Sequence, residues 1–345
     1  MPPKKKESIK QTKEEESEDV QQHKSPLKED VVQDVVQDDR GEEADGVDNN
    51  SEASLIGCRK RKDPPTSSTS TNKAPRHSTK DSKAEPATIH QIVQYLLTQS
   101  ALEQCRPNEE SKALSELSDT DRASLHTYSS SVFTPFIELL CAAILSRPIS
   151  HALGHRSIRT ILNEPYNFTT PKVIRTAGEQ TCIKALLEAR TQHKGKTATE
   201  IVHIADVVTE KFGGEDDTSL EEVRKQSGHD ANKERELLKA SIKGVGPMAL
   251  NIFFRRIQWL WIEAFPFMDE KTKDAMAALG LPDDAEELFE QVEALWDEMD
   301  TDEVAGKDED ERKRRAFTII LERALGAHLE KKTEAVLNEA SKIIR

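Results

Sequence analysis

Residues 242–251 have the sequence IKGVGPMALN, in which an apolar residue, a G-x-G turn and an apolar helix start follow one another directly. Gly244 and Gly246 can take φ > 0 and let another chain approach the backbone closely. Pro247 suits the first position of a helix, where its missing N–H would have no partner anyway. Such a turn directs free backbone N–H groups and a helix dipole outward, which favours phosphate binding. A plain helix–turn–helix connection explains the same residues. A lone G-x-G does not distinguish a phosphate-binding turn from such a structural connection.

A second segment, residues 267–282, has the sequence FMDEKTKDAMAALGLP. Asp269 lies 21 residues after Met248 and directly precedes a helical pattern over 270–279. Because Asp is a preferred N-cap, spacing alone predicts that Asp269 caps this helix, which Gly280 ends. A chemical role is compatible with capping, since a capping carboxylate is held rigidly and its N–H donors favour the ionised form.

A third segment, residues 136–146, has the sequence FIELLCAAILS and is apolar almost all round, which predicts a central, buried helix. Thr134 and Pro135 can start it as cap and first residue. The three segments, in this order, resemble the helix-hairpin-helix DNA glycosylases (the HhH-GPD domain), the superfamily of endonuclease III, the adenine glycosylase and the alkyladenine glycosylases. The resemblance covers a central motif region at 131–282.

In that family the hairpin grips DNA phosphate, and an aspartate that opens the helix after the next loop serves the chemistry. The resemblance therefore implies that Lys243, Gly244 and Gly246 contact DNA and that Asp269 is catalytic. A fixed carboxylate facing a flipped nucleotide could stabilise positive charge on the sugar as the base leaves, and could orient the attacking water. Met248 stands where bifunctional members carry the lysine that forms a Schiff base. Methionine cannot do this, which implies a monofunctional glycosylase without lyase activity or an inactive relative.

Further candidate contacts flank these motifs. Arg147 and Ile149 follow the 136–146 segment, in a loop that reaches into the duplex in the family and helps fill the gap left by the extruded base. A solvent-exposed turn is the alternative. On the helix after the hairpin, Arg255 is expected either to contact phosphate or to belong to an exposed face. The alternate spacing of Trp259 and Trp261 predicts one ring in the core and one near the cleft.

The 345-residue chain carries a net charge of −14, and its mean hydropathy is −0.68, so much of it must be solvated. This charge argues against a general nucleic-acid binder. However, the charge is uneven. Residues 283–310 hold fourteen acidic residues against one lysine, whereas residues 131–282 have a net charge of +1. The motif region is therefore expected to attract phosphate modestly, and less at high salt.

The four cysteines are widely spaced and form no C-x-x-C pair, which disfavours a zinc site and suits a reducing compartment. No cysteine follows Cys182, so the iron–sulfur cluster of some family members is not expected. His151 and His155 have helical spacing but no nearby third ligand. We therefore expect no metal and no cofactor. No run approaches the length of a membrane span, so no membrane partner is expected.

Residues 1–85 mix charge blocks with Ser, Thr, Pro and Lys and have almost no aromatic residues, which predicts a disordered tail. Within it, residues 59–62 (RKRK) are typical of a nuclear-import cluster. A solvated basic run or an electrostatic arm for DNA explains the same residues. We expect a nuclear monomer whose tail binds any protein partners.

From Pro86 onward the spacing of apolar residues is helical, and no alternating strand pattern occurs. We therefore predict an all-α chain, with a two-lobed helix-hairpin-helix glycosylase-like domain over 86–345 preceded by the tail. The resemblance implies that the C-terminal helices, at 283–345, pack with a helix at 89–98, and that the DNA cleft lies between the lobes. We expect the acidic stretch 297–310 to be an exposed, mobile loop.

These observations favour a base-excision-repair protein that binds double-stranded DNA and hydrolyses the N-glycosidic bond of a damaged or mispaired base. Two alternatives remain. The first is a non-catalytic DNA-binding or scaffolding relative of the glycosylases. The second is a helical protein-interaction module whose hairpin is only structural.

Overall fold

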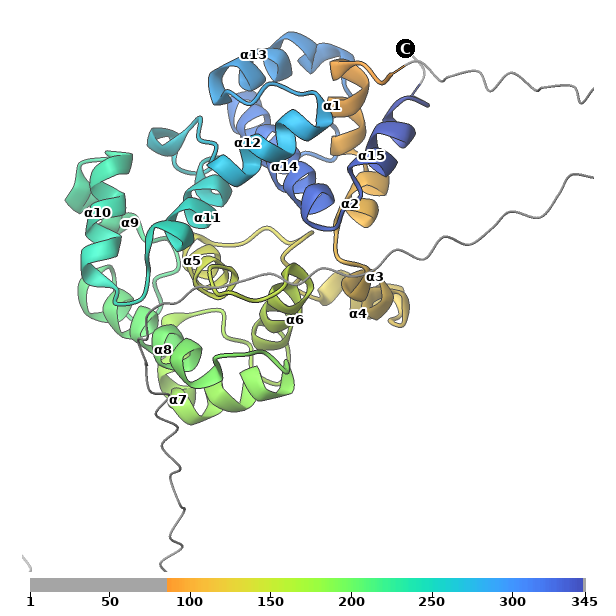
Figure 1. The fold of residues 1–345 in the computed structure, drawn as a ribbon. Helices are drawn as coiled ribbons and strands as arrows, with labels where there is room; N and C mark the ends of the chain where they lie inside the picture. Colours follow the sequence, from red (N-terminus) through yellow and green to blue (C-terminus); the bar gives the residue numbers. More distant parts are fainter. Residues whose placement is uncertain (1–85, 344–345) are drawn as a thin grey trace, which may run out of the picture. The chain divides into compact units, whose positions relative to one another are not determined.

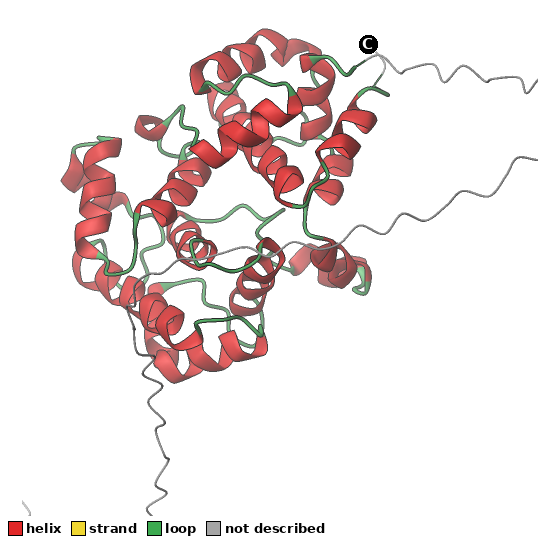
Figure 2. Cartoon of the chain, in the orientation of Figure 1, coloured by secondary structure: helices red, strands yellow, loops and turns green. Residues whose placement is uncertain are grey.

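A computed structural model describes residues 86–343, and the predicted tail with its basic cluster lies outside them. In this part the chain forms fifteen α-helices, two short 3-10 helices and no strand (Figures 1 and 2), which confirms the all-α prediction there. The α-helices are α1 (Ile89–Leu97), α2 (Gln99–Cys105), α3 (Asn108–Ser115), α4 (Asp119–Ser124), α5 (Pro135–Leu145), α6 (His151–Leu162), α7 (Pro171–Glu188), α8 (Lys194–Lys211), α9 (Glu221–Ser227), α10 (Ala231–Ser241), α11 (Pro247–Ile257), α12 (Glu270–Leu279), α13 (Ala285–Leu295), α14 (Glu309–Leu329) and α15 (Thr333–Ala340). The 3-10 helices are η1 (Ile262–Ala264) and η2 (Trp296–Glu298).

Proline sets the start of three helices, α5, α7 and α11, because it lies in the first turn, where an N–H has no intrahelical partner. Within α7, Gly178 has a φ of 71°, which breaks the helix into two segments. The short helices α3 and α4 were not anticipated, because polar residues dominate both.

The first hydrophobic cluster is built around α5 and contains residues from Tyr128 to Ala264. Phe136, Leu139 and Leu140 on α5 are fully buried. The helix packs against α6, α8 and α11, which surround it in Figure 1. A helix that is apolar on nearly every side requires such surroundings.

The second hydrophobic cluster joins the two ends of the described chain. Helix α1 packs against α14 and α15, and α14 packs against α12 and α13. The side chain of Gln91 donates a hydrogen bond of 2.8 Å to the carbonyl oxygen of Ile343. The cluster therefore combines residues 92–105 with residues 268–340.

The acidic stretch 297–310 is more ordered than expected. Met299 and Val304 are buried in the second cluster. The guanidinium of Arg312 donates to the carbonyl oxygens of Thr301, at 2.7 Å, and Val304, at 3.1 Å. These contacts fix the backbone of the stretch, while its carboxylates face water. The high density of charged residues in the sequence does not reveal this packing.

Glu234 on α10 is fully buried, and neither of its carboxylate oxygens has a hydrogen-bond partner among residues 86–343. Burial and the neighbouring Glu263 carboxylate raise the pKa of Glu234 to about 8. Although Glu263 is itself largely buried, Arg224 donates two hydrogen bonds to it, at 2.6 and 3.0 Å, and its pKa falls to about 2. Glu234 is therefore the member of the pair that holds a proton near neutral pH.

Because Glu234 is buried as a protonated acid beside Glu263, we expect the protein to lose stability at alkaline pH. Because the folded-state pKa of Glu234 exceeds the ordinary glutamate value, the stabilisation is present at low pH and is lost as pH rises from about 4.5 through about 8. Glu234→Gln should remove this dependence and gain on the order of 1 kcal/mol relative to the wild type at pH 9. Melting temperatures of both proteins at pH 6 and pH 9 test this, and parallel pH profiles would contradict it.

Candidate functional site

The predicted hairpin consists of α10, a turn at residues 242–246 and α11. Ile242 and Val245 are buried beneath the turn, whereas Lys243 and Gly244 are exposed. Gly244 has a φ of 101°, which favours glycine. Gly246 does not share this geometry. It is the extended N-cap of α11, with a φ of −104°, and an added Cβ would meet nothing within 4 Å.

A buried carboxylate lies beneath the turn. Glu200 on α8 is 4% exposed, and a Cβ at position 244 would lie 2.3 Å from its Oε1. Arg147, in the loop between α5 and α6, forms an ion pair with the same carboxylate. In this structure Arg147 therefore lies against Glu200 and does not project from the loop as a wedge. Ile149, two residues on, is half-buried and packs against the first cluster.

Asp269 is the N-cap of α12, as its spacing predicts, and it is 8% exposed. Its Oδ1 accepts hydrogen bonds from the backbone N–H groups of Lys271, at 3.1 Å, and Thr272, at 3.3 Å. Its Oδ2 accepts from the Thr272 hydroxyl at 3.2 Å and forms an ion pair with Arg255. Burial disfavours ionisation, but Arg255 and the Thr272 donors outweigh it, so the pKa of Asp269 lies below its ordinary value.

Arg255 was expected at a phosphate or on an exposed face, yet it is 4% exposed. Besides Asp269, it binds Glu322 on α14, with Nε to Oε1 at 2.5 Å. The next residue, Arg256, binds Glu138 on α5 through two atoms at 2.9 and 3.1 Å, and lies 3.8 Å from Glu322. Both guanidinium groups are thus occupied by internal carboxylates, so the exposed-face expectation is wrong.

One cavity of about 280 Å³ gathers most of the candidate residues. Its wall includes Asp269 from α12, Met248 from α11, and Arg147 and Ile149 from the loop before α6. Arg255 also lines this cavity. At the rim, Met248 and Leu329 are each 43% exposed, which is unusual for large apolar side chains. We call this space the Asp269 cavity.

Several residues of the site carried no motif signal. Glu322 and Tyr128 line the Asp269 cavity, and Glu200 supports the hairpin. Glu200 and Glu322 lie on helix faces that are otherwise apolar, among buried neighbours such as Ile204 and Leu321. An acidic residue on such a face requires a buried cation as its partner. This pattern in the sequence was the available signal that both glutamates are buried and paired.

The remaining candidates lie elsewhere. Trp261 is 2% exposed and packs edge-on to Phe253, while Trp259 is half-buried and lines a second cavity, away from Asp269. His155 binds Glu110 through Nδ1 at 2.8 Å, and His151 binds Glu330 at 2.9 Å. No group of three potential metal ligands occurs within residues 86–343.

Comparison of the chain with protein-family models, curated proteins and solved structures found no match. Between residues 86 and 343, no helix has the length and apolar character needed to cross a membrane.

The buried charges predict a specific stability loss. Arg255→Gln leaves Asp269 and Glu322 without their main countercharge, which should lower the free energy of unfolding by about 3–5 kcal/mol. Arg255→Lys should recover part of the lost free energy. Lysine keeps the positive charge, but it lacks the planar guanidinium that binds Asp269 and Glu322 at once. Arg314→Gln is the matched control, since Arg314 makes one 3.4 Å bond to the Trp259 carbonyl oxygen. Urea denaturation measures the free energy of unfolding of both Gln variants. Equal losses in the two would contradict the stabilising role of the buried ion pairs.

Proposed function

We propose that this chain is a DNA-binding protein of the base-excision-repair type. In this proposal it acts in the nucleus as a monofunctional glycosylase on a damaged or mispaired base. One observation carries the proposal: Asp269, Met248 and the loop residues Arg147 and Ile149 line a single cavity. They come from three segments that the family resemblance selected independently. Its helix-hairpin-helix glycosylase-like fold is part of the same proposal.

The Asp269 cavity would receive a nucleotide extruded from the duplex. The low pKa of Asp269 keeps the carboxylate ionised at neutral pH, so it can stabilise positive charge that develops on the sugar. Capping and the Arg255 ion pair fix its position, which suits preorganised electrostatic stabilisation. Met248 at the rim provides no amine, so the strand would stay intact.

The hairpin would hold the flanking phosphate. The first N–H groups of α11 have no intrahelical acceptor, and the space in front of Gly246 is open. Lys243 lies exposed on the same turn. The Glu200 carboxylate beneath the turn weakens the positive potential there, so we expect binding to be modest and to decline with salt.

A second candidate function, DNA binding without catalysis, is favoured by the bonding of Asp269. Both of its oxygens are already satisfied by Arg255, Lys271 and Thr272. A carboxylate neutralised in this way stabilises a developing cation less than a free one. The two functions share the DNA surface and differ only in chemistry.

Gly246→Val tests the DNA surface. The extended φ and open surroundings of Gly246 allow the substitution in the folded protein, while the new side chain blocks approach of a phosphate. Affinity for any duplex should fall about 10-fold or more, because hydrogen bonds to charged groups contribute about 1.5–3 kcal/mol. Gly195→Val is the control, since a Cβ there also meets open space. Fluorescence anisotropy measures both, and undiminished binding by folded Gly246→Val would make the hairpin merely structural.

Asp269→Asn tests the chemistry. Asn is a good helix cap, but it removes one of two carboxylates bound to Arg255, so some stability should be lost. Base release should slow by about 100-fold or more, since a transition-state electrostatic partner is missing. Single-turnover release is measured from duplexes that carry uracil, alkylated purines, oxidised bases or mismatches.

Arg255→Lys is the matched control, because it weakens the same ion pair while the Asp269 carboxylate remains. It should slow base release much less than Asp269→Asn does when both are assayed well below their melting temperatures, because the carboxylate itself is still present. Wild-type rates from folded Asp269→Asn would remove the catalytic assignment. No release by the wild type on any substrate, together with intact DNA binding, would establish the non-catalytic alternative.

A further inference from the structure

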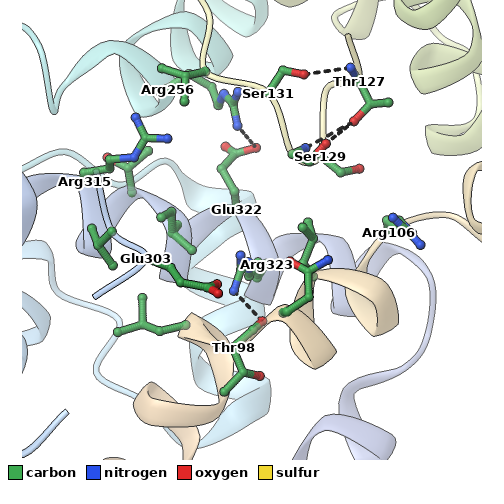
Figure 3. A pocket seen from close by; sticks show the side chains of 18 of the residues that line it. Thr98, Arg106, Thr127, Ser129, Ser131, Arg256, Glu303, Arg315, Glu322 and Arg323 are labelled. Carbon is green, nitrogen blue, oxygen red and sulfur yellow. Dashed lines mark hydrogen bonds and ion pairs between the residues drawn. The ribbon is translucent and has the colours of Figure 1, made fainter. Parts of the chain in front are cut away.

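A second cavity, larger than the Asp269 cavity, is distinct from the proposed DNA site. It has a volume of about 500 Å³ and lies between the α1–α2 junction, the loop at 127–133, the end of α11 and the helix α14 (Figure 3). We call it the Trp259 cavity. Glu322 belongs to the walls of both cavities, whereas Asp269 and Met248 do not line this one. Its volume is within the range of small-molecule sites.

Arg315 projects from α14 into this cavity without an ionic partner. Its guanidinium lies 4.6 Å from the centre of the Trp259 ring, and it forms no ion pair or hydrogen bond with any residue between 86 and 343. Burial, and then the positive charge of Arg256, lower the pKa of Arg315. Arg256 lines the same cavity and is bound by the Glu138 carboxylate, whereas Arg315 has no carboxylate partner among residues 86–343.

The opposite side of the same space supplies hydroxyl groups. Ser131 Oγ accepts a hydrogen bond from the Thr127 N–H at 2.9 Å, which leaves its own proton free to donate (Figure 3). Arg323 also lines the cavity and is held by the carbonyl oxygens of Leu96 and Thr98, at 2.6 and 2.8 Å. These groups are oriented donors, arranged by backbone contacts before any ligand arrives.

The nearby carboxylates neutralise these donors only in part. Glu138 and Glu311 act on Arg315 and Glu303 acts on Arg323, but none of them binds Arg315 directly. Four carboxylates line the cavity. Arg255 and Arg256 bind Glu138 and Glu322, while Asp300 and Glu303 are exposed to solvent. The region around Arg315 therefore has excess positive charge in a partly desolvated setting, where an anion gains more than it would in water.

We propose that the Trp259 cavity binds a small organic anion, with its oxyanion group against Arg315. The planar guanidinium fork matches both phosphate and carboxylate groups. The cavity is larger than the oxyanion alone requires, and apolar residues such as Leu97, Phe133 and Ile319 would cover the organic portion. This site is independent of DNA binding and of the role proposed for Asp269.

Calorimetric titration of the full chain tests the proposal with three probes: inorganic phosphate, adenosine 5′-monophosphate and citrate. The organic anions should bind saturably and more tightly than inorganic phosphate. The comparison of the monophosphate with citrate identifies the oxyanion that the site prefers. Arg315→Gln should weaken binding about 10-fold or more, as expected for a lost charged hydrogen bond. Because Arg315 makes no internal hydrogen bond, this variant should melt close to the wild type.

Lys313→Gln is the matched control, since Lys313 lies on the same helix but pairs with Glu309 outside the cavity. Its dissociation constants for the organic anions should stay within about twofold of the wild-type values. This change is much smaller than the tenfold weakening expected for Arg315→Gln. Absence of saturable heat with all three probes at millimolar concentration would overturn the proposal. Equal weakening by the two variants would also overturn it, because general surface charge would then explain binding.

Discussion

A buried chain of charges connects the two hydrophobic clusters. It runs from Asp269 through Arg255, Glu322 and Arg256 to Glu138. The arginines and Glu138 belong to helices of the first cluster, while Asp269 and Glu322 come from helices of the second. Removing such groups from water is costly, and their mutual attraction compensates only when the geometry is good. The contact between α11 and α14 therefore depends on this chain of ion pairs.

This chain also sets the state of Asp269. Burial opposes ionisation of Glu322 as well, but Arg255 and Arg256 lower its pKa, so both carboxylates that contact Arg255 remain charged. The same bonds that hold Asp269 ionised and fixed also reduce its free negative charge. Under the proposed function, the negative charge left on Asp269 decides between two outcomes. Either the cavity stabilises positive charge on the sugar as the base departs, or it only holds a nucleotide.

Local signals in the sequence predicted the helices at 136–146 and 270–279 and the capping role of Asp269. Pro135 and Pro247 begin helices as expected, and Gly280 ends α12 in the left-handed conformation. These features depend on a few neighbouring residues, so they are readable from spacing. The resemblance then selected Met248, Arg147 and Ile149, which line the Asp269 cavity together.

The partners of the charged residues were not readable from spacing. Arg255 and Arg256 end an amphipathic helix and resemble an exposed face, but their carboxylates lie on α5 and α14, far away in sequence. Arg147 similarly depends on Glu200, which only the packing of α8 brings beneath the hairpin. Tertiary contacts decided which carboxylate binds which guanidinium, and no local pattern encodes that pairing.

The central claim is that the Asp269 cavity accepts a nucleotide extruded from DNA. The most direct test compares affinity for a duplex that contains one abasic-site analogue with affinity for the intact duplex at the same salt concentration. Because a missing base removes part of the cost of unstacking, we expect about 10-fold tighter binding to the abasic duplex. Equal affinity for the two duplexes would contradict the claim.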